Sequence, residues 1–214
     1  MAITDFPYPE SYHEFYGDVF EHFEARLDGL PVPYIRTPEQ FYLIQTISGD
    51  GAMSAGIAEE INDRYKFRDM VIEDMAEARE YRKTGWVYDE WFHIWSCYAG
   101  KDANKHRIHT MRFGASIGDI IETPNMPYIL ALVTKEEHDQ KPTLETMRIA
   151  LENLYVYLCQ INGYCEVDPI ELIMPTIGCG LDRLNWDDVR QIIFDVFGEA
   201  MEAGWLMITV ARKG

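Results

Sequence analysis

Two glycine loops carry the residues whose types and spacing could do chemistry. GDGAMSAG (49–56) and IGCGLD (177–182) each follow a predicted strand and precede a predicted helix. Glycine permits a positive φ and a close approach of a ligand to the main chain, and the free N–H groups of such loops suit an anion such as a diphosphate. Neither loop matches GxGxxG or GxxxxGK[ST], which disfavours a Rossmann cofactor or a P-loop nucleotide.

Lys135 and Asp182 stand beside these loops. Lys135 follows the apolar run YILALVT (128–134), and Asp182 ends the second glycine loop. In open α/β sheets, ligands bind outside the carboxyl ends of the strands, so both side chains could face one ligand. Taken alone, Lys135 would be read as an ordinary surface lysine.

The elements that must position these loops alternate along the chain. Apolar runs predict strands at 41–48, 128–134, 170–176 and 205–210. Helical spacing predicts helices at 57–65, 69–83, 144–161 and, after the capping residue Asn185, up to Gly204. A strand is also expected at 108–113. Alternating strands and helices predict a layered α/β fold.

Residues 1–40 differ in composition, with eight acidic and two basic side chains. Ser11-x-x-Glu14 has the pattern of a capping box, and aromatic and aliphatic residues then recur at helical spacing up to Gly29. The segment is therefore predicted to be an amphipathic helix that packs on the rest of the chain.

Charge and composition exclude several classes. The formal net charge is −17, from 36 acidic and 19 basic side chains, so non-specific nucleic-acid binding is not expected. No apolar run is long enough to cross a bilayer, and the start of the chain lacks a secretory signal, which predicts a soluble cytoplasmic protein, with the nucleus left open. The four cysteines share no CxxC spacing, so free thiols are expected. The protein is also expected to hold no metal and no cofactor.

Three segments resemble macrodomains: TISGDGAMSAGIA, LVTKEEHDQKPTLE and MPTIGCGLDRLNWDDV. The match is closest to the subfamily that contains the terminal ADP-ribose protein glycohydrolase and the macrodomain antitoxins acting on ADP-ribosylated DNA. It covers residues 41–210, and 88–125 fits poorly. The resemblance implies a three-layer α/β/α macrodomain with a mixed central sheet at 41–214, an N-terminal helical extension at 1–40, and an insertion.

The resemblance also implies a function, a ligand and a site. The expected protein is a hydrolase that binds ADP-ribose and cleaves it from an ADP-ribosylated macromolecule. The favoured acceptor is a protein Glu or Asp, and a DNA base is the second choice. Lys135 would be the nucleophile and Asp182 the acid or base. The ligand-binding residues expected from the same motifs are Ser48, Met53, Ser54, Ala55, Gly56, Ile57, Thr134, Pro175, Ile177, Gly178, Cys179, Gly180 and Leu181.

Two departures from the family pattern leave questions open. Macrodomains usually hold the adenine amine with the aspartate of a Gly-Asp pair after an early strand, and YIRTPEQF (34–41) has no such pair. That role is therefore expected to fall to another residue, for example in the acidic N-terminal helix, or affinity to be lower. The aromatic insertion is a candidate lid, partner surface or additional core, and its His93, Cys97, His106 and His109 have irregular spacing for zinc.

Three alternative functions stay open. A non-catalytic reader of ADP-ribose would need neither a nucleophile nor a base. A hydrolase of O-acetyl-ADP-ribose or of ADP-ribose 1″-phosphate would use the same pocket. An acidic interaction protein would use the fold as a scaffold and would not bind ADP-ribose.

Overall fold

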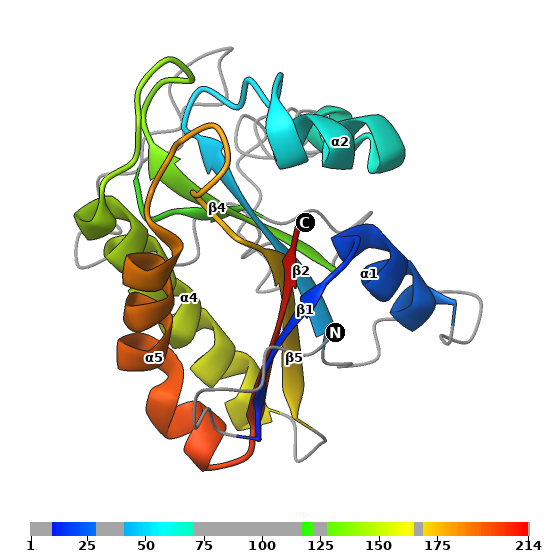
Figure 1. The fold of residues 1–214 in the computed structure, drawn as a ribbon, viewed down its shortest axis with the longest axis vertical. Helices are drawn as coiled ribbons and strands as arrows, with labels where there is room; N and C mark the ends of the chain where they lie inside the picture. Colours follow the sequence, from blue (N-terminus) through cyan, green and yellow to red (C-terminus); the bar gives the residue numbers. More distant parts are fainter. Residues whose placement is uncertain (1–9, 29–40, 71–116, 122–127, 165–168, 214) are drawn as a thin grey trace, which may run out of the picture.

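A six-stranded mixed sheet forms the centre of the molecule (Figure 1). The structure is a computed structural model, and it describes residues 10–28, 41–70, 117–121, 128–164 and 169–213. The strand order is β1-β6-β5-β2-β4-β3, in which β3 is antiparallel to β4 and the other pairings are parallel. The strands are β1 (Tyr12–Tyr16), β2 (Phe41–Ser48), β3 (Ile120–Ile121), β4 (Ile129–Lys135), β5 (Ile170–Pro175) and β6 (Leu206–Arg212).

Helices cover both faces of this sheet, which makes the three-layer α/β/α fold (Figure 1). One face carries α4 (Leu144–Tyr164) and α5 (Trp186–Glu202), and the other carries α1 (Val19–Leu27) and α2 (Gly56–Tyr65). Each face has its own apolar core, because successive side chains of a buried strand point to opposite sides. In β2, for example, Ile44 packs under α4 and α5, whereas Leu43 and Ile47 pack under α1 and α2.

The predicted strands and helices of the second half are confirmed. The structure places β4, α4, β5, α5 and β6 where the periodicity indicates them, and Asn185 caps α5 by accepting from the N–H groups of Asp187 and Asp188. The helix expected to stop at Asn162-Gly163 runs to Tyr164. The expected helix at 69–83 is described only to residue 70, and the strand expected at 108–113 lies outside the described residues, as do His93, Cys97, His106 and His109.

The single N-terminal helix predicted from Ser11 to Gly29 is wrong. Residues 12–16 form β1, which pairs in parallel with β6, and a helix begins only at Val19, after the N-cap Asp18. The spacing of Tyr12, Phe15 and Tyr16 is helical, but aromatic residues also favour strands, and pairing with a strand almost 200 residues later decides the structure. The described N-terminal residues therefore contribute an edge strand and a helix to the central sheet, while the division at residue 40 stays a prediction.

A buried carboxylate fastens α1 to this sheet. The side chain of Glu171 on β5 is 3% exposed and accepts hydrogen bonds from Thr209 Oγ1 (2.7 Å), Arg26 Nε (2.7 Å) and His22 Nε2 (3.1 Å). Burial alone would raise the pKa of Glu171, but the bonds from Thr209, Arg26 and His22 outweigh it, so this pKa is lowered. The carboxylate is satisfied only while α1 stays docked.

Replacing Glu171 should lower the free energy of unfolding and make it depend less on pH in the acid range. We expect Glu171→Gln to lower the free energy of unfolding at pH 7 by about 2 kcal/mol, since Arg26 and His22 lose a charged partner. The pKa of Glu171 is lower in the folded chain, so its stabilisation is complete above the unfolded value near 4.5 and is lost as pH falls below it. Wild-type stability should therefore fall more steeply than that of Glu171→Gln between pH 5 and pH 3.

Thermal or urea unfolding across this pH range provides the measurement. Glu152→Gln is the matched control, because Glu152 is an exposed carboxylate on α4 and should show the wild-type profile. Equal profiles for Glu171→Gln and Glu152→Gln would contradict the assignment.

Candidate functional site

The three segments singled out in the sequence follow three neighbouring strands. In the order β5-β2-β4, the central strand β2 is followed by GDGAMSAG, β4 ends at Lys135, and β5 is followed by IGCGLD. These strands are parallel, so their carboxyl ends meet at one edge of the sheet, where the loops gather (Figure 1). The chain passes from β2 to β4 on one side and then to β5 on the other, which is the strand arrangement that leaves a crevice for a ligand.

A cleft of about 750 Å³ opens at this edge. Lys135, Asp182 and twelve of the thirteen predicted ligand-binding residues line it: Ser48, Met53, Ser54, Ala55, Gly56, Ile57, Pro175, Ile177, Gly178, Cys179, Gly180 and Leu181. Thr134 is different, because it is fully buried, it does not line the cleft, and its Oγ1 has no hydrogen-bond partner among the described residues. The structure thus brings the predicted residues together with one exception, and their roles stay predictions.

Lys135 and Asp182 form an ion pair inside the cleft. Lys135 Nζ lies 2.7 Å from Asp182 Oδ1, and the two side chains are 15% and 18% exposed. A register shift precedes the lysine, because Ile47 pairs with Val133 while the next residue, Ser48, pairs with Lys135. A bulge of this kind re-aims the side chain that follows it. An amine and a carboxylate from two different strand ends therefore meet at one point of the cleft.

Backbone geometry explains several residues of the loops. Gly56 and Gly178 have positive φ values of 65° and 69°, and a Cβ on Gly178 would lie 2.7 Å from Met147 Cε. Met53 is buried with a φ of 42°, which is unusual for a residue with a side chain. A Cβ on Gly180 would meet no atom within 4 Å. Gly178 is therefore required by the fold, whereas Gly180 leaves open space at the cleft.

The electrostatics of the cleft favour an anion. The N-cap of α2, Ala55, makes no side-chain hydrogen bond to the first N–H groups of the helix, and this helix terminus lines the cleft, where N–H groups favour an anion. In a chain of net charge −17, two carboxylates and five basic side chains line the cleft. The basic residues are Lys135, His138, Lys141, Arg212 and Lys213.

Cys179 lines the cleft as a neutral thiol. Burial raises its pKa to about 11, and its Sγ donates a hydrogen bond to Ile177 O (3.3 Å). Cys179 is free, as is Cys159, which agrees with the expectation of free thiols for these two residues. A thiol with a raised pKa is a poor nucleophile, so Cys179 is not expected to act as one.

The Gly-Asp pair missing from 34–41 occurs earlier in the chain. Gly17 and Asp18 directly follow β1, Gly17 N donates to Arg212 O (3.2 Å), and Arg212 lines the cleft. Asp18 accepts from Phe20 N (2.9 Å) with one carboxylate oxygen and so begins α1. The sequence FYGDVF contains the Gly-Asp pair, but a helix was predicted there, so the strand that precedes the pair was not recognised.

A buried carboxylate on β1 supports two cleft residues that sequence reasoning missed. The Glu14 side chain is 3% exposed and accepts from Trp186 Nε1 (3.1 Å) and Arg212 Nη1 (3.2 Å), both of which belong to cleft-lining residues. It also accepts from Tyr12 and Arg190. Burial alone would raise the pKa of Glu14, but the bonds from Tyr12, Trp186 and Arg190 outweigh it and lower this pKa. Glu14 is an ionised anchor for Arg212.

Comparison with known proteins identifies relatives by sequence. The chain is 45% identical over 83 residues to an ADP-ribose glycohydrolase OARD1 from Bos taurus, covering 39% of this chain and 48% of that protein. It is 37% identical over 79 residues to the uncharacterized protein 032R of Invertebrate iridescent virus 6, covering 37% of this chain and 73% of that protein. The chain thus spans about half the length of the glycohydrolase that it matches. No family model matches the chain.

Comparison with solved structures identifies the fold. The macrodomain of Thermus aquaticus DarG superimposes with a TM-score of 0.51 and 18% identity over 94% of this chain and 97% of that one. The mixed sheet between two helical layers predicted from the sequence is confirmed by this likeness and by the strand order. In the part of the chain that the structure describes, no helix is both long and apolar enough for a membrane span. The chain therefore has the macrodomain fold, and 83 of its residues are similar in sequence to an ADP-ribose glycohydrolase.

Proposed function

We propose that the protein is an ADP-ribose glycohydrolase that binds ADP-ribose in this cleft and releases it from an acceptor. The observation that carries the proposal is the 2.7 Å contact between Lys135 Nζ and Asp182 Oδ1, between two glycine loops. A module that only binds ADP-ribose needs neither an amine nor a carboxylate at this point. The sequence similarity to an ADP-ribose glycohydrolase supports the same assignment.

The glycine loops and the N-terminus of α2 would bind the diphosphate. Their N–H groups offer donors without bulky side chains, and such donors favour an anion over a neutral ligand. Among the described residues, the amide groups of Gly180 and Leu181 donate to no other backbone carbonyl. The distal ribose would then lie between the two loops, with its C1″ atom toward Lys135.

The proposed reaction proceeds in two steps. In the first, the proton of the Lys135 ammonium passes to Asp182, Nζ forms a bond to C1″, and the bond from C1″ to the acceptor oxygen breaks, so that the acceptor leaves as a carboxylate. In the second, the ring bond from C1″ to O4″ in the lysyl adduct breaks as a proton passes from Nζ to O4″, which leaves a Schiff base. Water then adds to C1″, the bond to Nζ breaks, and the ring closes again. Asp182, 2.7 Å from Nζ, holds the proton taken from the ammonium and releases it to solvent at the end of the cycle. The products are free ADP-ribose, the acceptor carboxylate, one proton and the original lysine ammonium.

A protein carboxylate is the acceptor that we propose. A glutamate or aspartate ester leaves as a stable carboxylate, which suits attack by an amine on C1″. The net charge of −17 makes a nucleic-acid acceptor less favourable, since its phosphates would be repelled outside the cleft.

Release of labelled ADP-ribose from two substrates tests the function. A glutamate-modified protein and a guanine-modified DNA are incubated with the wild-type chain, with Lys135→Ala and with Asp182→Ala. We expect release from the protein substrate by the wild type alone. Binding of ADP-ribose without release from either substrate would indicate a reader or a hydrolase of smaller metabolites, and O-acetyl-ADP-ribose and ADP-ribose 1″-phosphate then distinguish these two.

Asp18 is proposed to recognise the adenine amine, because it belongs to a Gly-Asp pair beside a strand end of the cleft. We expect Asp18→Asn to weaken ADP-ribose binding about tenfold, as for a lost hydrogen bond to a charged group. Asparagine caps a helix as well as aspartate does, so α1 should remain stable. With its oxygen held by Phe20 N, the amide would present an NH₂ group to the adenine amine, where two donors oppose each other.

Calorimetry with ADP-ribose and with its hypoxanthine analogue measures this effect. Hypoxanthine lacks the amine, so the wild type should prefer ADP-ribose and Asp18→Asn should lose the preference. Glu21→Gln is the control, because Glu21 is an exposed carboxylate in the first turn of the same helix. A preference that survives Asp18→Asn would contradict the role.

A further inference from the structure

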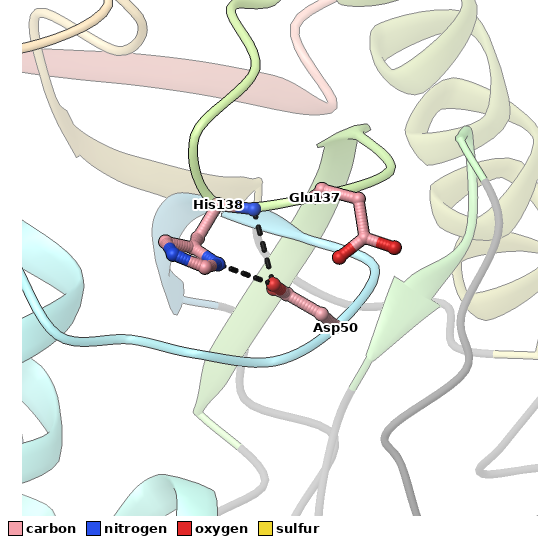
Figure 2. Close-up of side chains that lie close together, drawn as sticks. All are labelled: Asp50, Glu137 and His138. Carbon is pink, nitrogen blue, oxygen red and sulfur yellow. Dashed lines mark hydrogen bonds and ion pairs between the residues drawn. The ribbon is translucent and has the colours of Figure 1, made fainter.

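Asp50 connects the first glycine loop to the segment that follows Lys135. Its Oδ2 accepts from the backbone N of His138 (3.0 Å) and from His138 Nδ1 (2.8 Å). Its Oδ1 accepts from Ser48 Oγ and from Ala52 N (3.2 Å), both within its own loop. Figure 2 shows the two bonds from His138 converging on the Asp50 carboxylate, with Glu137 beside them. Oδ1 of Asp50 thus binds the first glycine loop, and Oδ2 binds the segment that follows Lys135.

Backbone bonds reinforce this connection at the lysine and at the residue that follows it. Gly49 N donates to Lys135 O (2.8 Å), and Asp50 N donates to Glu136 O (3.0 Å). These contacts directly follow the pair Ser48–Lys135, which is the pair at which the register of β2 against β4 has shifted. On its other side the loop is held by Arg68 Nε, which donates to Gly51 O (2.8 Å). The backbone of the lysine is therefore tied to a loop that is itself anchored.

We propose that Asp50 is a positioning residue, which fixes Lys135 for attack by clamping residues 135–138 onto the first glycine loop through His138. The inference rests on the proposed function for its catalytic consequence, while the clamp itself follows from the contacts above. Bond formation at C1″ requires Nζ within a few tenths of an ångström of the productive position, and displacements of about 1 Å cost catalytic groups roughly a hundredfold in rate. Asp50 lies outside the cleft lining and acts through other residues.

Charges around the clamp agree with this role. Burial alone would raise the pKa of Asp50, but the bonds from Ser48, His138 and Ala52 lower it to about 2, so the carboxylate is ionised at any pH where the protein works. The hydrogen bond and charge of Asp50 raise the pKa of His138, and Asp139 and Glu137 add to this effect. The bond from His138 Nδ1 can persist when the imidazole is neutral, since one ring nitrogen still carries a proton.

A divalent-cation site is the alternative interpretation of the residues that form the clamp. Asp50, Glu137 and His138 each place one possible ligand atom within 4.8 Å of the others, although Glu137 and His138 are exposed. A cation would have to displace the N–H and O–H donors that already occupy both oxygens of Asp50. A clamp uses those donors as they stand, so the geometry favours it.

Matched removal of one negative charge separates the two readings. Asp50→Asn and Glu137→Gln each neutralise one carboxylate of this group. In Asp50→Asn, the amide oxygen can still accept the hydrogen bonds from Ser48 and Ala52. The NH₂ group then faces the two N–H donors of His138 and cannot accept from them. We expect turnover to fall about tenfold or more in Asp50→Asn and to stay within twofold of wild type in Glu137→Gln. ADP-ribose affinity should change by less than about threefold in either variant, because the loop side of the clamp is retained.

Replacement of His138 supplies the test of rescue. Asparagine at this position can offer an N–H group in place of Nδ1, so His138→Asn should retain most of the turnover that His138→Ala loses. The melting temperature of each variant is measured beside it. A loss of activity that follows the melting temperature, with no difference between the asparagine and alanine variants, would overturn the positioning role.

Failure of the proposed function is distinguishable from failure of the clamp. If the wild type releases no ADP-ribose from any substrate, the proposed function fails, and amide hydrogen exchange then tests the clamp without activity. Exchange at residues 49–53 and 135–138 should be faster in Asp50→Asn than in Glu137→Gln, and equal exchange would overturn the clamp. Turnover that needs Mn²⁺ or Mg²⁺, with Glu137→Gln as damaged as Asp50→Asn, would overturn it in favour of a cation site.

Discussion

Replacement of Lys135 by alanine is expected to abolish release of ADP-ribose, with turnover falling about a thousandfold or more, because the nucleophile is lost. The variant should still bind ADP-ribose, since the glycine loops and the N-terminus of α2 are unchanged. Turnover is measured with a glutamate-modified protein and affinity by calorimetry. A variant that keeps full turnover would exclude Lys135 as the nucleophile.

Lys135→Arg is the matched variant for this prediction. Arginine retains the positive charge opposite Asp182, so the ion pair at 2.7 Å can be replaced, but its guanidinium does not lose a proton and does not attack C1″. Inactivity of both variants together with retained binding would separate nucleophilicity from charge. Reduction with cyanoborohydride during turnover should attach ADP-ribose to Lys135 in the wild type alone, which peptide mass spectrometry detects.

The site was readable from the sequence wherever its residues are local. Strand, glycine loop and helix follow one another within about 20 residues around Gly56 and again around Gly178, and hydrophobic periodicity reports such short units directly. Lys135 and Asp182 were singled out through the macrodomain motifs that contain them, because Lys135 taken alone would be read as a surface lysine. Their 2.7 Å contact was not readable, since it depends on the strand order β5-β2-β4.

The contacts that sequence reasoning missed join segments far apart in the chain. Glu14 reaches Arg212 across β1 and β6, and Asp50 reaches His138 across two loops. Neither pairing has a local signature, because hydrophobic periodicity and capping patterns report only residues that are close in the sequence. Asp18 had a signature, the Gly-Asp pair, but recognising it required knowing that residues 12–16 are a strand of the sheet.

The two glycines of IGCGLD are expected to respond oppositely to alanine. In Gly178→Ala, the new Cβ would lie 2.7 Å from Met147 Cε and 3.0 Å from Leu184 Cδ1, at a φ of 69° that disfavours any side chain. Met147 is fully buried and has little room to move. Overpacking and backbone strain together should lower the free energy of unfolding by about 2–4 kcal/mol.

Gly180→Ala serves as the matched partner of this variant. Its Cβ would meet no atom within 4 Å and its φ is not positive, so the free protein should keep its melting temperature within about 2 °C. The methyl group would instead occupy open space at the cleft, where the loop amides are proposed to approach the diphosphate. Affinity for ADP-ribose should therefore fall about tenfold or more, as when a ligand loses close contact with main-chain donors.

Thermal unfolding and calorimetry on both variants decide whether this loop serves the fold, the ligand or both. A loop that is only a tight turn would tolerate alanine at 180 in both measurements, because nothing in the protein occupies that space. A loop that binds a diphosphate through its main chain must lose affinity there while the protein stays folded. Wild-type affinity in Gly180→Ala would therefore contradict the anion cradle and would leave Gly178 as a purely structural glycine.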